Sequence, residues 1–149
     1  MPSPETFCDV LEHLNRENAR YVVVGGFAVV MHGHKRDIAD LDIVIDPSPP
    51  EAARCLHALA LAGFIPTILL PVEMVSVIRL FDQLAREVNV FLRAAVSFEK
   101  LWPRAKFVQV GYNMARIAAF EDLLEGKRIV GRGSDVADVE ALMRLDAID

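Results

Sequence analysis

Asp40 and Asp42 are the residues of this chain whose type and spacing most directly indicate chemistry. They begin the segment 40–45, whose other residues are apolar. Side chains two residues apart in a β-strand project from the same face, so both carboxylates would lie together where a buried strand begins. Two such carboxylates repel each other unless a cation lies between them. The spacing therefore predicts a divalent-cation site, for which Mg²⁺ or Mn²⁺ is the expected ion.

A pair of glycines, Gly25 and Gly26, ends the apolar run 22–24. Glycine permits a tight turn and lets backbone amides approach an anion closely, and a helix that follows such a turn favours the anion further. Taken alone, the pair is also compatible with a strand-to-helix turn that binds nothing. The nearby acidic pair favours a phosphate-binding turn. Together, the glycines and the acids predict two parts of a magnesium–nucleotide site, the phosphate-binding turn and the cation ligands.

Length and composition predict one compact domain over residues 1–149. The chain is 53% hydrophobic, and its mean hydropathy is +0.30, which suits a full core. No apolar window approaches the length of a membrane span, and the first residues lack the features of a signal peptide. With only Cys8 and Cys55, no disulfide framework is implied, which favours the cytoplasm. The apolar composition also leaves room for a homodimer, at a face that nothing in the sequence locates.

The charge balance argues against binding along extended nucleic acid. The chain has 16 basic and 21 acidic residues, a formal net charge of −5, and no dense run of Lys and Arg. Such a chain cannot neutralise a row of phosphates. A small anionic ligand that arrives with its own Mg²⁺ remains compatible, because the metal supplies the positive charge.

Hydrophobic periodicity and capping residues predict helices and strands that alternate along the chain. Helices are expected over about 3–16, 26–31, 48–63, 97–102, 117–127 and 135–145, with Ser3 and Ser48 as N-caps. Strands are expected over 22–24, 41–45, 75–80, 88–92 and 107–110. This alternation predicts an α/β (α+β) fold, a central mixed sheet of about four to six strands with helices packed against it.

The glycine pair, Arg36 and the Asp40-x-Asp42 motif together resemble the signature of the polymerase-β-type nucleotidyltransferase superfamily. The resemblance is closest to its small bacterial members, the minimal nucleotidyltransferases and the toxin components of abortive-infection systems. It covers about residues 7–145. A recurring pattern of these proteins, Lys…Arg-x-x-Asp-x-x-Asp, is matched by Lys127, Arg132, Asp135 and Asp138.

The resemblance implies a nucleoside triphosphate substrate and transfer of its nucleoside monophosphate to a hydroxyl on a protein, an RNA end or a small molecule. Asp40 and Asp42 would hold Mg²⁺ and Gly25 and Gly26 would shape the phosphate site, while Arg36 and Lys127 would contact the phosphates. A hydroxyl would attack the α-phosphate in line, and pyrophosphate would leave.

Two alternatives remain for the C-terminal residues. Lys127 lies near the end of a predicted helix and could instead complement its dipole. Arg132, Asp135 and Asp138 are interpreted as a capping and salt-bridge network of the last helix.

His32 and His34 supply only two zinc ligands and are interpreted as turn residues.

The chain departs from the family pattern at the third carboxylate. The position that best matches it is Asn89, whose amide oxygen can ligate a metal but carries no negative charge and cannot act as a base. Glu87, two residues earlier on the same strand face, is the candidate replacement. Ile38 is a second departure, because relatives often carry Thr there.

These departures leave three functions open. The first is an active nucleotidyltransferase. The second is a catalytically degenerate nucleotide-binding module that acts as a sensor or regulator. The third is a toxin that depends on a cognate antitoxin protein.

Overall fold

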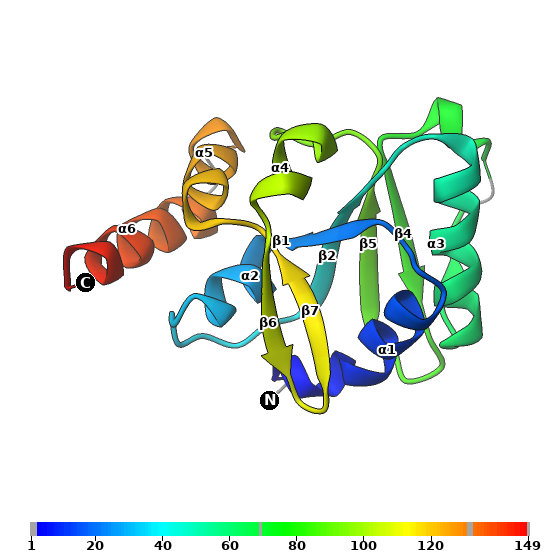
Figure 1. Ribbon diagram of the computed structural model, residues 1–149, viewed down its shortest axis with the longest axis horizontal. Coiled ribbons are helices and arrows are strands. Elements are labelled where there is room, and N and C mark those ends of the chain that lie inside the picture. The colour runs from blue at the N-terminus through cyan, green and yellow to red at the C-terminus, as the bar shows by residue number, and fades with distance from the viewer. Residues whose placement is uncertain (1–2, 69, 131–132, 149) are drawn as a thin grey trace.

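A seven-stranded mixed β-sheet forms the centre of the protein (Figure 1). The computed structural model describes residues 3–68, 70–130 and 133–148. The strands are β1 (Tyr21–Val24), β2 (Asp40–Ile45), β3 (Ile65–Pro66), β4 (Val77–Phe81), β5 (Glu87–Phe91), β6 (Lys106–Val110) and β7 (Asn113–Ile117). Their order across the sheet is β3-β4-β5-β2-β1-β7-β6.

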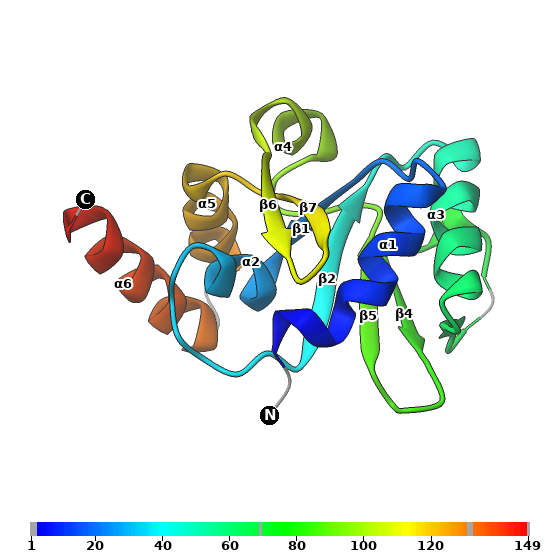
Figure 2. The ribbon, with the colours of Figure 1, turned by 60° about the horizontal axis from the view of Figure 1, so that its bottom comes forward.

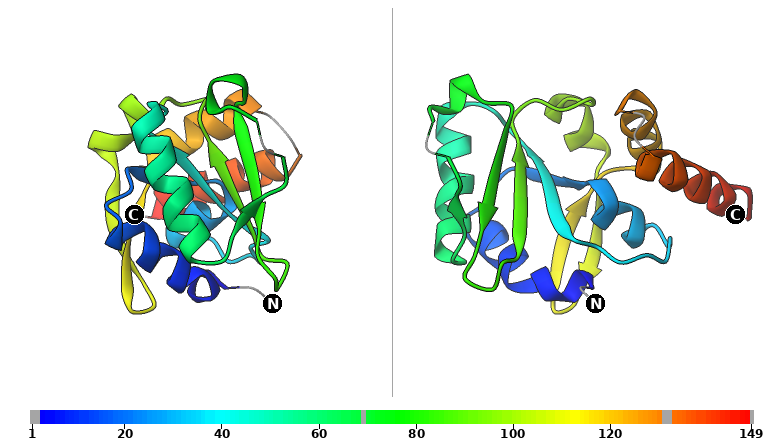
Figure 3. Two further views of the ribbon diagram at one scale, coloured as in Figure 1. Left: turned by 90° about the vertical axis from the view of Figure 1, so that its right-hand side faces the viewer. Right: turned by 180° about the vertical axis from the view of Figure 1, so that it is seen from behind.

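The helices lie in two groups about this sheet. They are α1 (Cys8–Arg16), α2 (Gly25–Met31), α3 (Pro49–Leu61), α4 (Phe98–Arg104), α5 (Phe120–Val130) and α6 (Gly133–Ile148), with short 3₁₀ turns at Pro4–Phe7 and Val72–Met74. α1 and α3 pack together over the sheet (Figures 2 and 3). α5 and α6 pack together on the opposite side of the molecule from α3 (Figure 1). In the described ranges, no helix has the length and apolarity needed to cross a bilayer.

The register of the central strands brings the sequence-predicted acids to one place. β1 pairs antiparallel with β2, so that Val24 lies opposite Asp42. β2 pairs parallel with β5, so that Asp40 lies opposite Glu87 and Asp42 opposite Asn89. Because side chains at alternate positions share a face, these four polar residues form one group on one face of the sheet.

The other face of β2 is apolar and forms the core. Leu41, Ile43 and Ile45 are at most 1% exposed, and Val88 and Val90 of β5 are fully buried beside them. Burying a side chain of this size stabilises a fold by roughly 1.5–3 kcal/mol. The alternation along β2 therefore explains why its acidic face cannot be turned inward.

The predicted fold class is confirmed, but the number of strands is wrong. The sheet has seven strands instead of four to six, because β3 and β7 were missed. β3 has two residues, too few to show a pattern. The helix expected from Ile117 begins at Phe120, because Ile117 is the last residue of β7.

Ser3 and Ser48 lie at the N-cap positions where they are expected, but the capping hydrogen bonds of their side chains are absent. The backbone carbonyl of Ser3 instead accepts hydrogen bonds from the backbone N and the Oγ1 of Thr6, at 3.0 and 2.7 Å. The first turn is therefore a 3₁₀ helix, and α1 begins only at Cys8.

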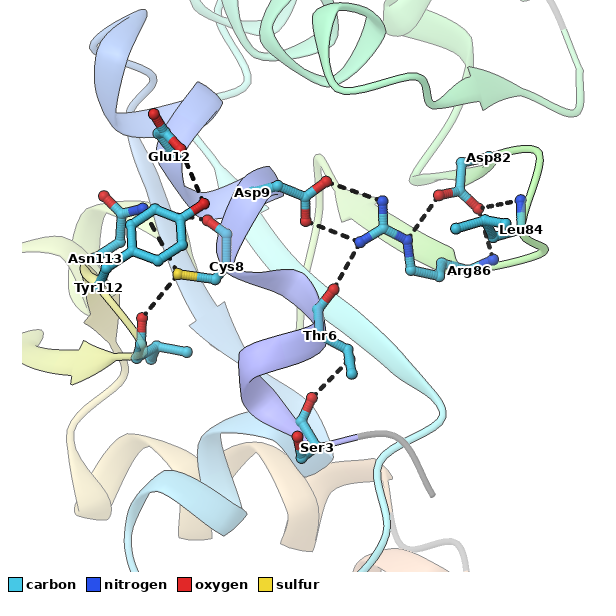
Figure 4. Close-up of polar contacts among 11 residues, drawn as sticks. Ser3, Thr6, Cys8, Asp9, Glu12, Asp82, Leu84, Arg86, Tyr112 and Asn113 are labelled. Atoms are coloured by element: carbon cyan, nitrogen blue, oxygen red, sulfur yellow. Dashed lines mark hydrogen bonds and ion pairs between the residues drawn. The ribbon is translucent and has the colours of Figure 1, made fainter.

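Arg86 fastens the turn between β4 and β5 to the N-terminal segment (Figure 4). Its guanidinium makes ion pairs with Asp9, at 2.8 and 3.0 Å, and with Asp82, at 2.7 Å. Its Nη1 also donates to the backbone carbonyl of Thr6 at 2.6 Å. The hydrogen bond with Arg86 is the main reason why the pKa of Asp9 is below its ordinary value.

We expect Arg86→Met to lower the free energy of unfolding by about 2 kcal/mol, because it leaves the buried Asp82 carboxylate without its cation. Urea denaturation followed by circular dichroism measures this change. Arg16→Met is the matched control, since Arg16 pairs with Glu12 on the surface and such pairs contribute at most about 1 kcal/mol. Equal losses in the two variants would show that the Arg86 network has no special role.

Candidate functional site

The amide of Asn89 lies at the centre of the acidic group. Its Nδ2 donates to Asp40 Oδ2 at 3.0 Å, to Asp42 Oδ1 at 2.9 Å and to Glu87 Oε2 at 2.9 Å. Asn89 is only 6% exposed. The two amide hydrogens are therefore shared among three carboxylates. The structure brings together all four residues that the sequence predicted for the metal site.

The amide nitrogen stands in the place where the sequence predicts a cation. A partially positive NH₂ group facing carboxylates reduces their repulsion, although less than a metal ion does. No group of three or more His, Cys, Asp or Glu side chains in the described ranges is arranged to hold a metal. Glu87, the candidate replacement, contacts Asn89 and lies 3.8 Å from the Nε of Arg79.

The residues nevertheless offer a suitable donor set for Mg²⁺ or Mn²⁺. The Oδ1 of Asn89 is buried and has no hydrogen-bond partner in the described part of the chain. A half-turn of the amide would direct this oxygen toward Asp40 and Asp42 in place of the nitrogen. Two carboxylates and one amide oxygen are hard ligands of the kind that Mg²⁺ prefers.

Burial and mutual repulsion raise the pKa of both aspartates. Desolvation, followed by the charge of Asp40, raises the pKa of Asp42 to about 6. Desolvation, followed by the charge of Glu87, raises the pKa of Asp40 above its ordinary value. The site therefore favours a proton or another cation near these carboxylates.

The two glycines make room for other residues of the site. Gly25 has a φ of +68°, and a Cβ there would lie 2.4 Å from Asp42 Oδ2. A Cβ on Gly26 would lie 2.3 Å from Arg36 Nη2. The absence of side chains at this turn thus allows one acid and one cation to pack directly against the backbone.

Arg36 and Lys127 meet at a carboxylate of the last helix. Arg36 Nη1 lies 2.8 and 2.9 Å from the two oxygens of Asp138, and Lys127 Nζ lies 3.0 Å from Asp138 Oδ2. The prediction of a salt-bridge network at this helix is confirmed for Asp138. Of the other predicted members, Arg132 and the side chain of Asp135 lie outside the described residues.

A cavity of about 340 Å³ adjoins this arrangement. Asp42, Gly25 and Lys127 line it, and most of its remaining wall is apolar. The apolar side chains come from three parts of the chain: Val24, Val44 and Phe91 from the sheet, Val96 and Leu101 from the segment before and within α4, and Leu123 from α5. A charged end next to an apolar chamber suits a ligand with a charged end and an uncharged body.

Arg93 and Asp122 are polar residues of this wall that the sequence analysis did not assign to the site, and Asp122 is the buried one. It is 2% exposed, and neither carboxylate oxygen has a hydrogen bond in the described chain, although the Nε of Arg104 lies 3.3 Å away. Burial raises its pKa above the ordinary value. Its position in the first turn of α5 was visible in the sequence, but its neighbour Arg104 comes from α4, a different element of the chain.

The histidines do not form a metal site in the described structure. His32 Nε2 lies 2.9 Å from the carbonyl oxygen of Ala118, and His34 Nε2 lies 3.9 Å from Asp138 Oδ1. Both therefore contact groups of the C-terminal segment.

Comparison with solved structures identifies the fold. The lincosamide antibiotic adenylyltransferase LnuA in its lincomycin-bound form is 17% identical over 97% of this chain and 98% of its own, with a TM-score of 0.68. The antibiotic-resistance factor ANT(2")-Ia in complex with adenylyl-2"-tobramycin is 8% identical over 97% of this chain and 92% of its own, with a TM-score of 0.67. An antigenic nucleotidyltransferase-like protein from Paracoccidioides brasiliensis is 17% identical over 96% and 76%, with a TM-score of 0.61. No protein-family model and no curated protein matches the chain.

The raised pKa of Asp42 predicts a pH-dependent cost to stability. In the folded state its carboxyl holds a proton up to about pH 6, whereas in the unfolded chain it ionises near pH 4. The folded protein therefore loses stability relative to the unfolded chain as the pH rises through this interval. We expect Asp42→Asn to raise the free energy of unfolding by about 2 kcal/mol at pH 7.5 and by almost nothing at pH 4.

Urea denaturation in metal-free buffer at both pH values measures the effect, with Asp37→Asn, in the segment that precedes β2, as the control. A gain that is equal at both pH values would contradict the electrostatic explanation.

Proposed function

We propose that this chain, which has the fold of the nucleotidyltransferases, binds a nucleoside triphosphate with a divalent cation and transfers the nucleoside monophosphate to a hydroxyl. One observation carries the proposal: Asp40, Asp42 and Asn89 converge on one point beside a cavity that Gly25 and Lys127 also line. At that point the metal ion of a metal–phosphate complex would neutralise the carboxylates of Asp40 and Asp42, and its phosphate would neutralise Lys127.

The apolar part of the cavity is proposed to receive the nucleoside. Its volume of about 340 Å³ lies within the usual range for small-ligand sites. Val44, Phe91 and Leu101 present apolar surface to a base and ribose. Lys127 and Arg36 are proposed to attract the triphosphate, since both are cations within the same charge cluster.

Asp40, Asp42 and the Oδ1 of Asn89 are the residues proposed to hold Mg²⁺ or Mn²⁺. When bound, the ion would neutralise phosphate oxygens and stabilise the charge that develops on the leaving pyrophosphate. Asn89 cannot remove a proton, so Glu87, which contacts it at 2.9 Å, is the proposed acceptor of the proton from the attacking hydroxyl. The oxygen of that hydroxyl would form the new bond to the α-phosphorus as the bond to pyrophosphate breaks.

We propose a small hydroxylated compound as the acceptor. The similar length of the two chains supports this proposal, because the alignment covers 98% of LnuA and 97% of the present chain. LnuA is described with lincomycin, and ANT(2")-Ia with adenylyl-2"-tobramycin. A polycation is the less suitable acceptor here, because apolar side chains dominate the cavity wall.

A degenerate nucleotide-binding module is the second candidate function. It is favoured by the position of the Asn89 amide, which holds Asp40 and Asp42 together without a metal. Such a protein would bind the nucleotide and release no pyrophosphate.

Transfer can be measured with the four ribonucleoside triphosphates, labelled at the α-phosphate, together with Mn²⁺ or Mg²⁺ and a panel of small hydroxylated compounds. We expect binding of at least one nucleotide and pyrophosphate release. Asp42→Asn should lower the rate by about a hundredfold or more, since it removes a group that supports charge stabilisation. Glu140→Gln, an exposed residue of α6, is the control. Binding without release in the parent protein would favour the module, and no binding of any nucleotide would refute both functions.

Restoring the missing carboxylate should strengthen the cation site. We expect Asn89→Asp to bind Mn²⁺ at least about tenfold more tightly, because it adds a negative charge next to Asp40 and Asp42. Water-proton relaxation of Mn²⁺ solutions measures the affinity without requiring activity. Gln109→Glu adds the same charge on the exposed side of β6 and should leave the affinity unchanged. Equal affinities in all three proteins would show that position 89 does not face the cation.

A further inference from the structure

Asp138 is a buried anion held between two cations from distant parts of the chain. It lies on α6 and is 2% exposed. Arg36 reaches it from the segment between α2 and β2, and Lys127 reaches it from α5. The three charges therefore join α6 to both neighbouring segments.

The charge of each of these cations also acts on one of the acids of the candidate site. Burial dominates the raised pKa of Asp40 and Asp42, but the charge of Arg36 opposes the shift at Asp40 and the charge of Lys127 opposes it at Asp42. The two cations thus pair with Asp138 and also interact electrostatically with the acidic pair. A triphosphate bound by the metal would have to lie in the same field.

The placement of Asp138 indicates that it positions Arg36 and Lys127 and does not occupy the place of a ligand. Lys127 lines the cavity, whereas Asp138 is absent from the described residues of its wall. Arg36 uses only Nη1 for Asp138, while its Nη2 lies against Gly26 at the turn after β1. The carboxylate therefore contacts the charged groups of both side chains without lining the described cavity, whose wall includes Lys127 and not Arg36.

We infer that Asp138 is a positioning residue of the phosphate-binding site: it holds Arg36 and Lys127 side by side so that both can receive triphosphate oxygens. The inference rests on the proposed function. Two like charges at this separation repel each other, and long side chains lose conformational entropy when they are ordered. A buried carboxylate between them offsets both costs before the ligand arrives. α6 is then a part of the site and not only a packing element.

Inorganic tripolyphosphate with Mg²⁺ is the probe, since it tests the anion site without depending on the base. By isothermal titration we expect Asp138→Asn to bind it about tenfold more weakly than the parent chain, the factor that corresponds to the loss of one charge-assisted contact. Glu140→Gln, on the same helix, should bind as the parent chain does. Titrations are done where near-ultraviolet circular dichroism shows each variant folded. Unchanged or tighter binding by the folded Asp138→Asn variant would overturn the inference.

Hydrogen exchange on the unmodified protein gives a second test that does not depend on a variant. If α6 supports phosphate binding, then binding must in turn stabilise α6, because coupling between two events is reciprocal. Saturating tripolyphosphate should therefore slow exchange of the backbone amides of residues 133–148 by at least about threefold. Unchanged exchange would indicate that Asp138 has only a structural role, and faster exchange would indicate that it competes with phosphate. Either result would overturn the inference.

The two proposals can fail separately. If the parent protein transfers nucleotide and the Asp138→Asn variant binds tripolyphosphate as tightly as the parent does, only the inference about Asp138 is refuted. If the parent protein binds no nucleotide but binds tripolyphosphate in a way that depends on Asp138, the proposed function is refuted and the anion site is retained. A parent protein that binds neither probe removes both.

Discussion

Electrostatic repulsion between Asp40 and Asp42 is the constraint around which the candidate site is arranged. Both carboxylates project from one face of β2, and the opposite face of that strand is committed to the core. Turning either acid away would expose buried apolar side chains, so the repulsion has to be met locally. The amide of Asn89 meets it from β5, and Arg36 and Lys127 add positive charge on the side of α6.

The backbone around the acids is shaped by the same requirement. Gly25 leaves space for the carboxylate of Asp42, and Gly26 leaves space for the guanidinium of Arg36. A side chain at Gly25 would displace the carboxylate of Asp42, and a side chain at Gly26 would displace the guanidinium of Arg36. The glycine pair thus serves the internal charge arrangement before any ligand is bound, and the same open turn lies at the wall of the cavity.

Local patterns in the sequence were sufficient to predict the fold class, the acidic pair and the glycine turn, since each depends on residues close in the chain. The place of Asn89 beside the acids was predicted only through the family resemblance, because it lies 47 positions from Asp42. Local patterns could not predict that Arg36 and Lys127 meet at Asp138, because the Arg36–Asp138 contact spans 102 positions. β7 was missed because Asn113–Ile117 runs directly into a helical pattern. Asp122 was missed because its neighbour Arg104 comes from α4, a different element of the chain. Long-range packing decides these features, and periodicity does not encode it.

The join between β1 and β7 has a mechanical consequence. These strands pair only at Val23 and Ile117, with one further hydrogen bond from Ala118 N to Val23 O at 2.9 Å. The acids lie on one side of this join, whereas α5, with Lys127, continues from the other. Buried side chains therefore carry most of the connection between these strands, because Val23, Ile117 and Ala118 are fully excluded from solvent. The stiffness of this seam depends on how well those side chains pack and little on the backbone, since few backbone contacts cross it.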